Sequence, residues 1–239
     1  MAEGKPHEPT PRRQVVSFAF FKVQPEWRRL PDAEREEHRR EFAEIVHRWT
    51  IEDQMKVLSY STVGIRPECD FMLWRICYSL ECLQEMQQEV LSTRLAGYLL
   101  TPYSYLAMTK RSQYLIGHVH EGQHDSRGVI KPGGFKYAFI YPFVKTRAWY
   151  MLPYEERQRM MSEHIRVGHE YPRVRLNTTY SFGLDDQEFV VAFETDHPED
   201  FLDLVMQLRE SEASSYTLRD VPVFTCVQTT PEEMLQRLG

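Results

Sequence analysis

Four side chains with complementary chemistry lie within the 24 residues from Tyr141 to His164. The four residues are Tyr141, Lys145, Trp149 and His164. An imidazole can ligate a metal, a phenol can lose an electron and a proton, and an ammonium can bind a carboxylate. Together these groups suit redox chemistry at a bound porphyrin, which needs an axial ligand, an oxidisable phenol and a cation for a carboxylate.

His164 is expected on an amphipathic helix, because apolar residues surround it at helical spacing. Met160, Met161 and Gly168 stand at positions i−4, i−3 and i+4, so the imidazole shares the apolar face. Two interpretations follow from this pattern. The ring is either a metal ligand, with Gly168 leaving room for a flat molecule, or a core histidine whose hydrogen bonds are satisfied.

Tyr141 and Lys145 are four residues apart on a predicted strand. Successive side chains of a strand alternate between its faces, so these two share one face, with Phe143 between them. The pattern is compatible with a pair that binds and oxidises a substrate. It is equally compatible with a packed ring beside a solvated ammonium.

The elements that must position these residues repeat along the chain. The first set is predicted as a strand at 15–23, a helix at 32–49, strands at 55–65 and 69–78, a helix at 80–94 and a strand at 103–111. The second set is a strand at 136–145, a helix at 153–170, strands at 173–182 and 187–195, a helix at 198–210 and a strand at 217–227. Two consecutive βαββαβ units indicate an α+β fold with two ferredoxin-like halves. We expect helices on one face of each sheet and the other faces packed together as a dimeric α+β barrel-like domain pair.

This order divides the chain into five predicted segments. They are a flexible N-terminal arm at 1–13, an N-terminal half at 14–114, a connector at 115–134, a C-terminal ligand-binding half at 135–228 and a tail at 229–239. The connector carries His118, His120 and His124. Long irregular connections are often functional or disordered, so this one is a candidate lid or crossover.

Composition excludes several classes of function. The net charge of −6, without a Lys/Arg cluster among aromatic residues, gives no support to nucleic-acid binding, and GxGxxG and P-loop patterns are missing. No apolar run reaches the roughly 20 residues of a membrane helix, and the first residues lack the apolar core of a secretory signal. Four cysteines without a CxxC pair favour a reducing cytoplasm.

The pattern Y-P-x-x-K before W-Y-M-L-P resembles a segment of the chlorite dismutase-like haem proteins, and within them of the actinobacterial-type coproheme decarboxylases. The resemblance covers about residues 14–227 and is most specific in the second half. It implies iron coproporphyrin III as the bound porphyrin and His164 as its proximal iron ligand, with a hydrogen-bond acceptor for the other ring nitrogen. It also implies Tyr141 as the radical-forming residue, Lys145 on a propionate, and Trp149 near the second reactive propionate.

The resemblance also implies residues on the distal side of the porphyrin. His124 precedes Tyr141 by 17 residues, the spacing of a distal histidine that helps to deprotonate hydrogen peroxide. His124 could equally be an exposed loop histidine, and His118 and His120 are alternatives. Leu176 stands seven residues before Gly183, where chlorite dismutases carry a distal arginine and the actinobacterial-type decarboxylases a small apolar residue. Arg175 is adjacent but should point to the opposite face of its strand.

A last segment, L-R-E-S-E-A-S, is similar to the family pattern L/M-R-x-x-E-x-S. It implies that Arg209 and Ser214 contact porphyrin propionates, since a guanidinium offers parallel N–H donors to a carboxylate. The alternative is the end of a surface helix, with Arg209 paired locally to Glu210, Glu212 or Asp220.

The resemblance implies a haem-biosynthetic enzyme that converts iron coproporphyrin III to haem b with hydrogen peroxide. It also implies a homo-oligomeric ring, commonly a pentamer. Chlorite dismutase is the first alternative, and Leu176 and the Tyr141–Lys145 pair oppose it. A haem-binding sensor or carrier without turnover, and an α+β barrel domain that binds no haem, are the others.

Overall fold

The computed structural model describes residues 12–51, 54–114 and 128–239. The first βαββαβ unit consists, in chain order, of β1 (Val15–Val23), α1 (Asp32–Ile51), β2 (Lys56–Ser61), β3 (Phe71–Cys77), α2 (Leu80–Leu91) and β4 (Leu99–Met108). Short 3₁₀ helices precede α1 and β4, at Trp27–Arg29 and Leu95–Tyr98. Ser79 begins α2 as a side-chain cap, because its hydroxyl accepts the Cys82 N–H.

The second unit has the same order with additions. It consists of β5 (Tyr137–Lys145), α3 (Arg147–Met151), α4 (Tyr154–His169), β6 (Arg175–Tyr180), β7 (Phe189–Thr195), α5 (Pro198–Glu210), the 3₁₀ helix η3 (Glu212–Tyr216), β8 (Thr217–Arg219) and β9 (Phe224–Thr229). Helix α6 (Pro231–Gln236) follows, with a capping box between Thr230 and Glu233. The α+β class with two βαββαβ units is therefore confirmed.

The strands close into a barrel. Their order is β7-β6-β4-β1-β3-β2-β9-β5-β8, and β7 also pairs with β5. Each half alone has the antiparallel ferredoxin-like order, β4-β1-β3-β2 in the first and β9-β5-β7-β6 in the second. Within the described ranges the half-sheets pair at two short seams, where Met108 pairs with Tyr180 and where Ser59–Ser61 pairs with 227–229.

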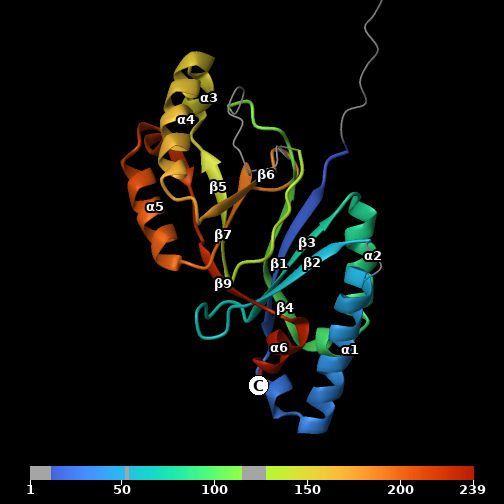
Figure 1. Cartoon of the computed structure of the whole chain (residues 1–239). Helices are drawn as coiled ribbons and strands as arrows, with labels where there is room; N and C mark the ends of the chain where they lie inside the picture. The colour runs from blue at the N-terminus through green and yellow to red at the C-terminus, as the bar shows by residue number, and fades with distance from the viewer. Residues whose placement is uncertain (1–11, 52–53, 115–127) are drawn as a thin grey trace, which may run out of the picture.

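Alternation along the strands separates an inner core from two outer cores. In β5, Ala138 and Ile140 point into the barrel, whereas Phe139, Tyr141 and Phe143 point outward. The barrel interior is filled by large side chains, among them Phe18, Phe20, Trp74 and Phe224. Outside the barrel, α1 and α2 cover the first half-sheet and α4 and α5 the second (Figure 1). The outer face of β5 therefore lies under helices, where a ligand can be enclosed.

The structure corrects one predicted strand. Residues 217–227 form two strands, β8 and β9, which both pair with β5 and are interrupted at 220–223. Pro222 lies in the interruption, and proline has no N–H to donate to a strand ladder. Helix α3 was also absent from the predicted elements. The tail after 228 forms α6, whose Met234 and Leu235 are buried on the first half.

No helix of the described ranges is long and apolar enough to cross a membrane. The predicted segment boundaries between the halves and the connector stay predictions.

Candidate functional site

Helices α4 and α5 cover the outer face of β5 (Figure 1). A cavity lies between this face and the two helices. Residues from β5, α4, α5, η3, β8 and the segment between β8 and β9 line it. Its wall is formed by Tyr141, Phe143, Lys145, His164, Phe201, Val205, Leu208, Arg209, Ala213, Ser214, Thr217, Asp220 and Val223. The structure thus brings together five of the predicted site residues: Tyr141, Lys145, His164, Arg209 and Ser214.

Strand β5 supplies the tyrosine and the lysine. Tyr141 packs against Phe193 of the neighbouring strand, with ring centroids 6.3 Å apart. Lys145 is 8% exposed, and its ammonium donates a hydrogen bond to the Ala213 carbonyl of η3. A register shift between Val144 and Lys145, where β5 pairs with β8, brings the end of the strand against η3.

Helix α4 supplies the histidine. Met160 and Val167 are its buried residues, and His164 lies between them at helical spacing, so the ring faces the sheet. The acidic Glu155 and Glu156 in the first turn and the basic Arg166 in the last turn favour the helix through its dipole. The His164 Nδ1 atom is buried and has no hydrogen-bond partner among the described residues. The acceptor expected for one ring nitrogen is therefore not found for Nδ1, whose hydrogen-bonding capacity is unused among the described residues.

Helix α5 and η3 form the opposite wall. Phe201, Val205 and Leu208 of α5 give it an apolar surface, and Ser214 of η3 adds a hydroxyl to the lining. Arg209 is half-exposed and forms an ion pair with Asp220, one of the three carboxylates considered from the sequence. Glu212 instead pairs with Arg159 of α4. The cavity lining therefore combines apolar side chains with two cationic ones, Lys145 and Arg209.

Burial sets the protonation of these groups. Burial lowers the pKa of His164 to about 4, with a further decrease from the charge of Lys145, so the imidazole is neutral at pH 7. Burial also lowers the pKa of Lys145 to about 8, and the Glu188 carboxylate opposes this shift. The pKa of Tyr141 is raised by burial and by Asp220, so its phenol keeps a proton. The site thus presents a nitrogen lone pair, an ammonium and a protonated phenol.

The remaining predicted residues lie outside the wall. Trp149 of α3 is buried, and the Lys145 Nζ atom lies 4.5 Å from its ring centroid. Leu176 is 51% exposed and pairs with Phe193 of β7. Because Phe193 also packs against Tyr141, Leu176 lies on the same face of the sheet as Tyr141, on strand β6 beyond β7. His124, with His118 and His120, lies outside the described residues. Arg175 is engaged elsewhere, since its guanidinium donates to the carbonyls of Lys131 and Gly133.

Sequence reasoning missed Glu188, which contacts the lysine segment from the residue just before β7. Its carboxylate accepts hydrogen bonds from the Lys145 N–H and the Tyr150 hydroxyl, at 2.8 and 2.6 Å. A glutamate at the start of a strand is usually exposed, so no pattern distinguished it. The apolar face of α5 is indicated by the sequence, because Phe201, Val205 and Leu208 recur at helical spacing.

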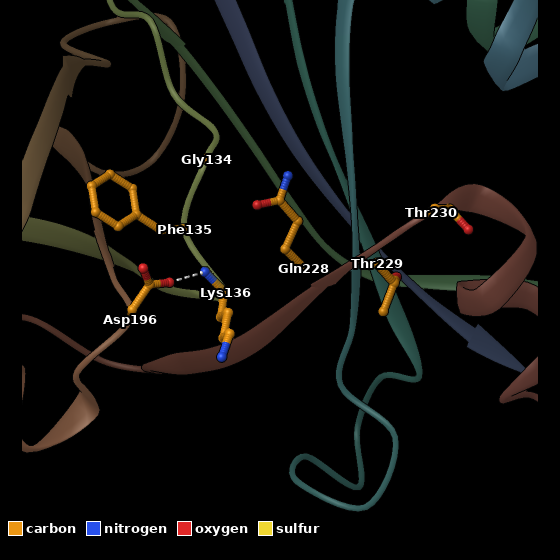
Figure 2. Close-up of a pocket in the computed structure, with 7 residues that line it drawn as sticks. All are labelled: Gly134, Phe135, Lys136, Asp196, Gln228, Thr229 and Thr230. Carbon is orange, nitrogen blue, oxygen red and sulfur yellow. Dashed lines mark hydrogen bonds between the residues drawn. The ribbon is translucent and has the colours of Figure 1, made fainter.

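A larger hollow of about 460 Å³ lies elsewhere, at the ends of β7 and β9 beside the start of β5. Figure 2 shows Asp196 beside the backbone of Lys136, whose N–H donates to the carboxylate at 2.7 Å. Gln228, Thr229 and Thr230 form the other side. None of the predicted site residues lines this hollow, so the smaller cavity on β5 is the candidate site.

Comparison with known proteins identifies the family. An α+β barrel with a histidine, a lysine and a tyrosine around one cavity, between the second half-sheet and its helices, defines the class of site. The family model described as chlorite dismutase matches residues 35–229. The chain belongs to the chlorite dismutase family, which includes haem-dependent enzymes.

Individual relatives agree with this placement. The coproheme decarboxylase of Mycolicibacterium smegmatis is 32% identical over 180 residues, which are 75% of each chain. The structure of chlorite dismutase from Candidatus Nitrospira defluvii in complex with imidazole superimposes with a TM-score of 0.84 and 26% identity, covering 94% of both chains. A heme-binding protein from Thermus thermophilus shares the fold, with a TM-score of 0.83 and 24% identity over 95% of both chains.

The residues of the cavity fit an iron porphyrin chemically. The neutral His164 imidazole in the lining would suit an iron ligand, the apolar wall of α5 the macrocycle, and Lys145 and Arg209 its carboxylates. The free space is about 150 Å³, below the roughly 300 Å³ of typical ligand pockets. A porphyrin would therefore need more space than the cavity offers in this structure.

The neutral His164 predicts an acid-dependent loss of stability in the porphyrin-free protein. The folded state holds the ring neutral down to about pH 4, whereas the unfolded chain protonates it below its ordinary value of 6.5. The unfolded state therefore binds more protons across this window, and the free energy of unfolding falls as the pH decreases through it. At pH 5 this loss is about 2 kcal/mol.

Urea denaturation at pH 7 and pH 5 checks this expectation. His164→Gln should remove the His164 contribution, so its free energy of unfolding should fall less between the two pH values than that of the wild-type protein. Equal decreases in both proteins would show that the ring is not held neutral.

Proposed function

We propose that this protein catalyses the oxidative decarboxylation of iron coproporphyrin III to haem b, with hydrogen peroxide as the oxidant. The observation that carries the proposal is the arrangement of Tyr141, Lys145 and His164 around one cavity. A metal ligand alone suits any haem protein. An oxidisable phenol beside a cation for a carboxylate suits the removal of that carboxylate.

Each residue has a role in this proposal. His164 ligates the iron, and Lys145, Arg209 and Ser214 hold propionates by charge-assisted and neutral hydrogen bonds. Burial keeps the proton on Tyr141, so the phenol can lose its electron and proton together and the tyrosyl radical can take a hydrogen atom from the propionate β-carbon. The bound iron porphyrin with peroxide supplies the oxidising equivalent. His124 would take the peroxide proton, and Trp149 and Leu176 would border the substrate.

The reaction balances for each propionate. One carboxylate side chain, one hydrogen peroxide and one proton give one vinyl group, one carbon dioxide and two water molecules. The propionate loses two electrons as its C–H and C–C bonds break, and the peroxide gains both as its O–O bond breaks. A second round at another propionate yields haem b.

The apolar side chain at position 176 favours this reaction over chlorite dismutation. A guanidinium would bind the chlorite oxyanion by charge, and Leu176 offers none. The neighbouring Arg175 binds carbonyl groups of the segment before β5 and contacts the ring of Phe135, at 4.6 Å from its centroid. This arginine is therefore committed to another part of the protein.

The proposal is tested by loading the purified protein with iron coproporphyrin III, titrating hydrogen peroxide and following the extracted porphyrin by mass spectrometry. We expect stepwise loss of two carboxyl groups, ending at haem b. Unchanged or bleached porphyrin would contradict the proposal. Oxygen release from chlorite, measured with an oxygen electrode, would then indicate chlorite dismutase, and tight binding of haem b without turnover a sensor or carrier.

A further inference from the structure

The buried carboxylate of Glu188 holds the segment that carries Lys145 at two points. One oxygen, Oε2, accepts the Lys145 backbone N–H at 2.8 Å and the Tyr150 hydroxyl at 2.6 Å. The other oxygen, Oε1, lies 4.0 Å from the Arg147 guanidinium, which is almost fully exposed. Glu188 is itself 8% exposed, and its own N–H donates to the Phe143 carbonyl at 3.2 Å. A single side chain therefore ties the end of β5 to helix α3.

The position and the charge of the Lys145 ammonium depend on the contacts of this junction between β5 and α3. It lies over the Trp149 ring, which belongs to the same short helix as Tyr150, and it donates to the Ala213 carbonyl. A carbonyl oxygen and an aromatic face are neutral partners, so neither provides the full charge that a buried ammonium requires. In the part of the chain that the structure describes, the Glu188 carboxylate is the charge that raises the Lys145 pKa against the effect of burial.

The other titratable groups near Lys145 do not replace this carboxylate. His164 on α4 is neutral at pH 7, and the Tyr141 phenol is protonated. Asp220 is paired with Arg209, so these two charges largely cancel. Among the described residues, the titratable groups that line the cavity with Lys145 are Tyr141, His164, Arg209 and Asp220, and those joined to its segment through the Glu188 carboxylate are Arg147 and Tyr150.

We propose that Glu188 is the positioning residue of the site: its carboxylate fixes the junction of β5 and α3 and keeps the Lys145 ammonium charged for a substrate carboxylate. This inference rests on the proposed function for the identity of that carboxylate. The control of Lys145 by Glu188 is a property of the protein alone, so the two can be tested separately.

The matched variants are Glu188→Gln and Tyr150→Phe. The glutamine retains an oxygen acceptor for the Lys145 N–H and removes the charge, whereas the phenylalanine removes one hydrogen bond and leaves the charge. Glu188→Asp retains the charge on a shorter side chain and serves if the glutamine variant does not fold. Circular dichroism and urea denaturation establish that each variant is folded before it is compared.

The first measurement is the titration of Lys145 in the porphyrin-free protein, from its ¹³Cε NMR signal, assigned by Lys145→Arg. We expect a midpoint at about pH 8 in the wild-type protein and one lower by about one pH unit in Glu188→Gln. The Lys145 midpoint of Tyr150→Phe should lie within a few tenths of a pH unit of the wild-type midpoint. The midpoint of Glu188→Asp should lie between those of the wild-type protein and Glu188→Gln. An unchanged midpoint in both Glu188 variants would overturn the inference, whether or not the protein binds porphyrin.

The second measurement is the dissociation constant of iron coproporphyrin III as a function of pH. Wild-type affinity should fall as the pH rises through about 8, because the ammonium loses its charge, and in Glu188→Gln the fall should begin at lower pH. At pH 8 the variant should bind about 5-fold more weakly, because about half of the wild-type lysines and about a tenth of the variant lysines are then charged. Lys145→Arg should show no such step, because a guanidinium stays charged.

The two measurements separate the possible failures. A wild-type protein that binds no coproporphyrin contradicts the proposed function, while the Lys145 titration still decides the role of Glu188. Binding that weakens by the same factor at every pH in Glu188→Gln would overturn the inference in favour of a purely structural role.

Discussion

A Tyr141→Phe protein is expected to bind iron coproporphyrin III with wild-type affinity and to lose decarboxylation by about two to four orders of magnitude. The phenyl ring conserves the packing against Phe193, so the cavity wall should not change. Without the hydroxyl, however, the ring has no proton to lose with its electron. The reaction would then stop before a hydrogen atom leaves the propionate.

Tyr137→Phe is the matched control, because Tyr137 lies on the same face of β5 and packs into the same outer core. Binding is followed by the absorbance of the porphyrin, and conversion by mass spectrometry of the extracted product. Full conversion by Tyr141→Phe would remove Tyr141 from the mechanism. If Tyr137→Phe loses as much activity as Tyr141→Phe, the loss comes from a disturbance of β5 and not from the missing Tyr141 hydroxyl.

Replacing His164 by alanine is expected to weaken the binding of iron coproporphyrin III by at least about 100-fold, because the variant lacks the proposed axial ligand. The change also leaves space between Met160 and Val167 that free imidazole can occupy. Added imidazole should therefore restore part of the affinity. The electron paramagnetic resonance spectrum of the ferric complex should change with the loss of histidine and return with imidazole.

His169→Ala is the control for this experiment, since His169 is an exposed residue near the end of the same helix. Its affinity and spectrum should match those of the wild-type protein. If His164→Ala keeps both the affinity and the ferric spectrum, the iron ligand must be another residue.

The overall fold could be predicted because the hydrophobic patterns of both halves follow the periods of strands and helices. Alternation in 136–145 and the helical spacing in 153–170 agree with β5 and α4 to within one residue at each end. The division of 217–227 into β8 and β9 could not be predicted from alternation. It depends on which strand each part pairs with, and both parts pair with β5.

Much of the candidate site was also accessible from sequence, because Tyr141, Lys145 and His164 lie on two regular elements whose faces the periodicity indicates. Glu188 was not, since its contact with the Lys145 segment joins residues 43 positions apart through the β5–β7 pairing. The ion pair of Arg209 with Asp220, rather than with Glu210 or Glu212, similarly depends on where the chain turns after β8.

The short seams of the barrel have a consequence for the origin of the chain. At one seam, the pairing of Met108 with Tyr180 is supported by Ser181, whose hydroxyl donates to the Leu106 carbonyl at 2.8 Å, and by Asp185, which accepts the Leu106 N–H at 2.8 Å. Each half has a complete ferredoxin-like strand order, so an ancestor with a single unit could have closed the same barrel by pairing two identical chains. In a single chain, a substitution in one unit needs no counterpart in the other. The two units therefore differ here: the second carries the cavity residues, and the first a sheet covered by α1 and α2.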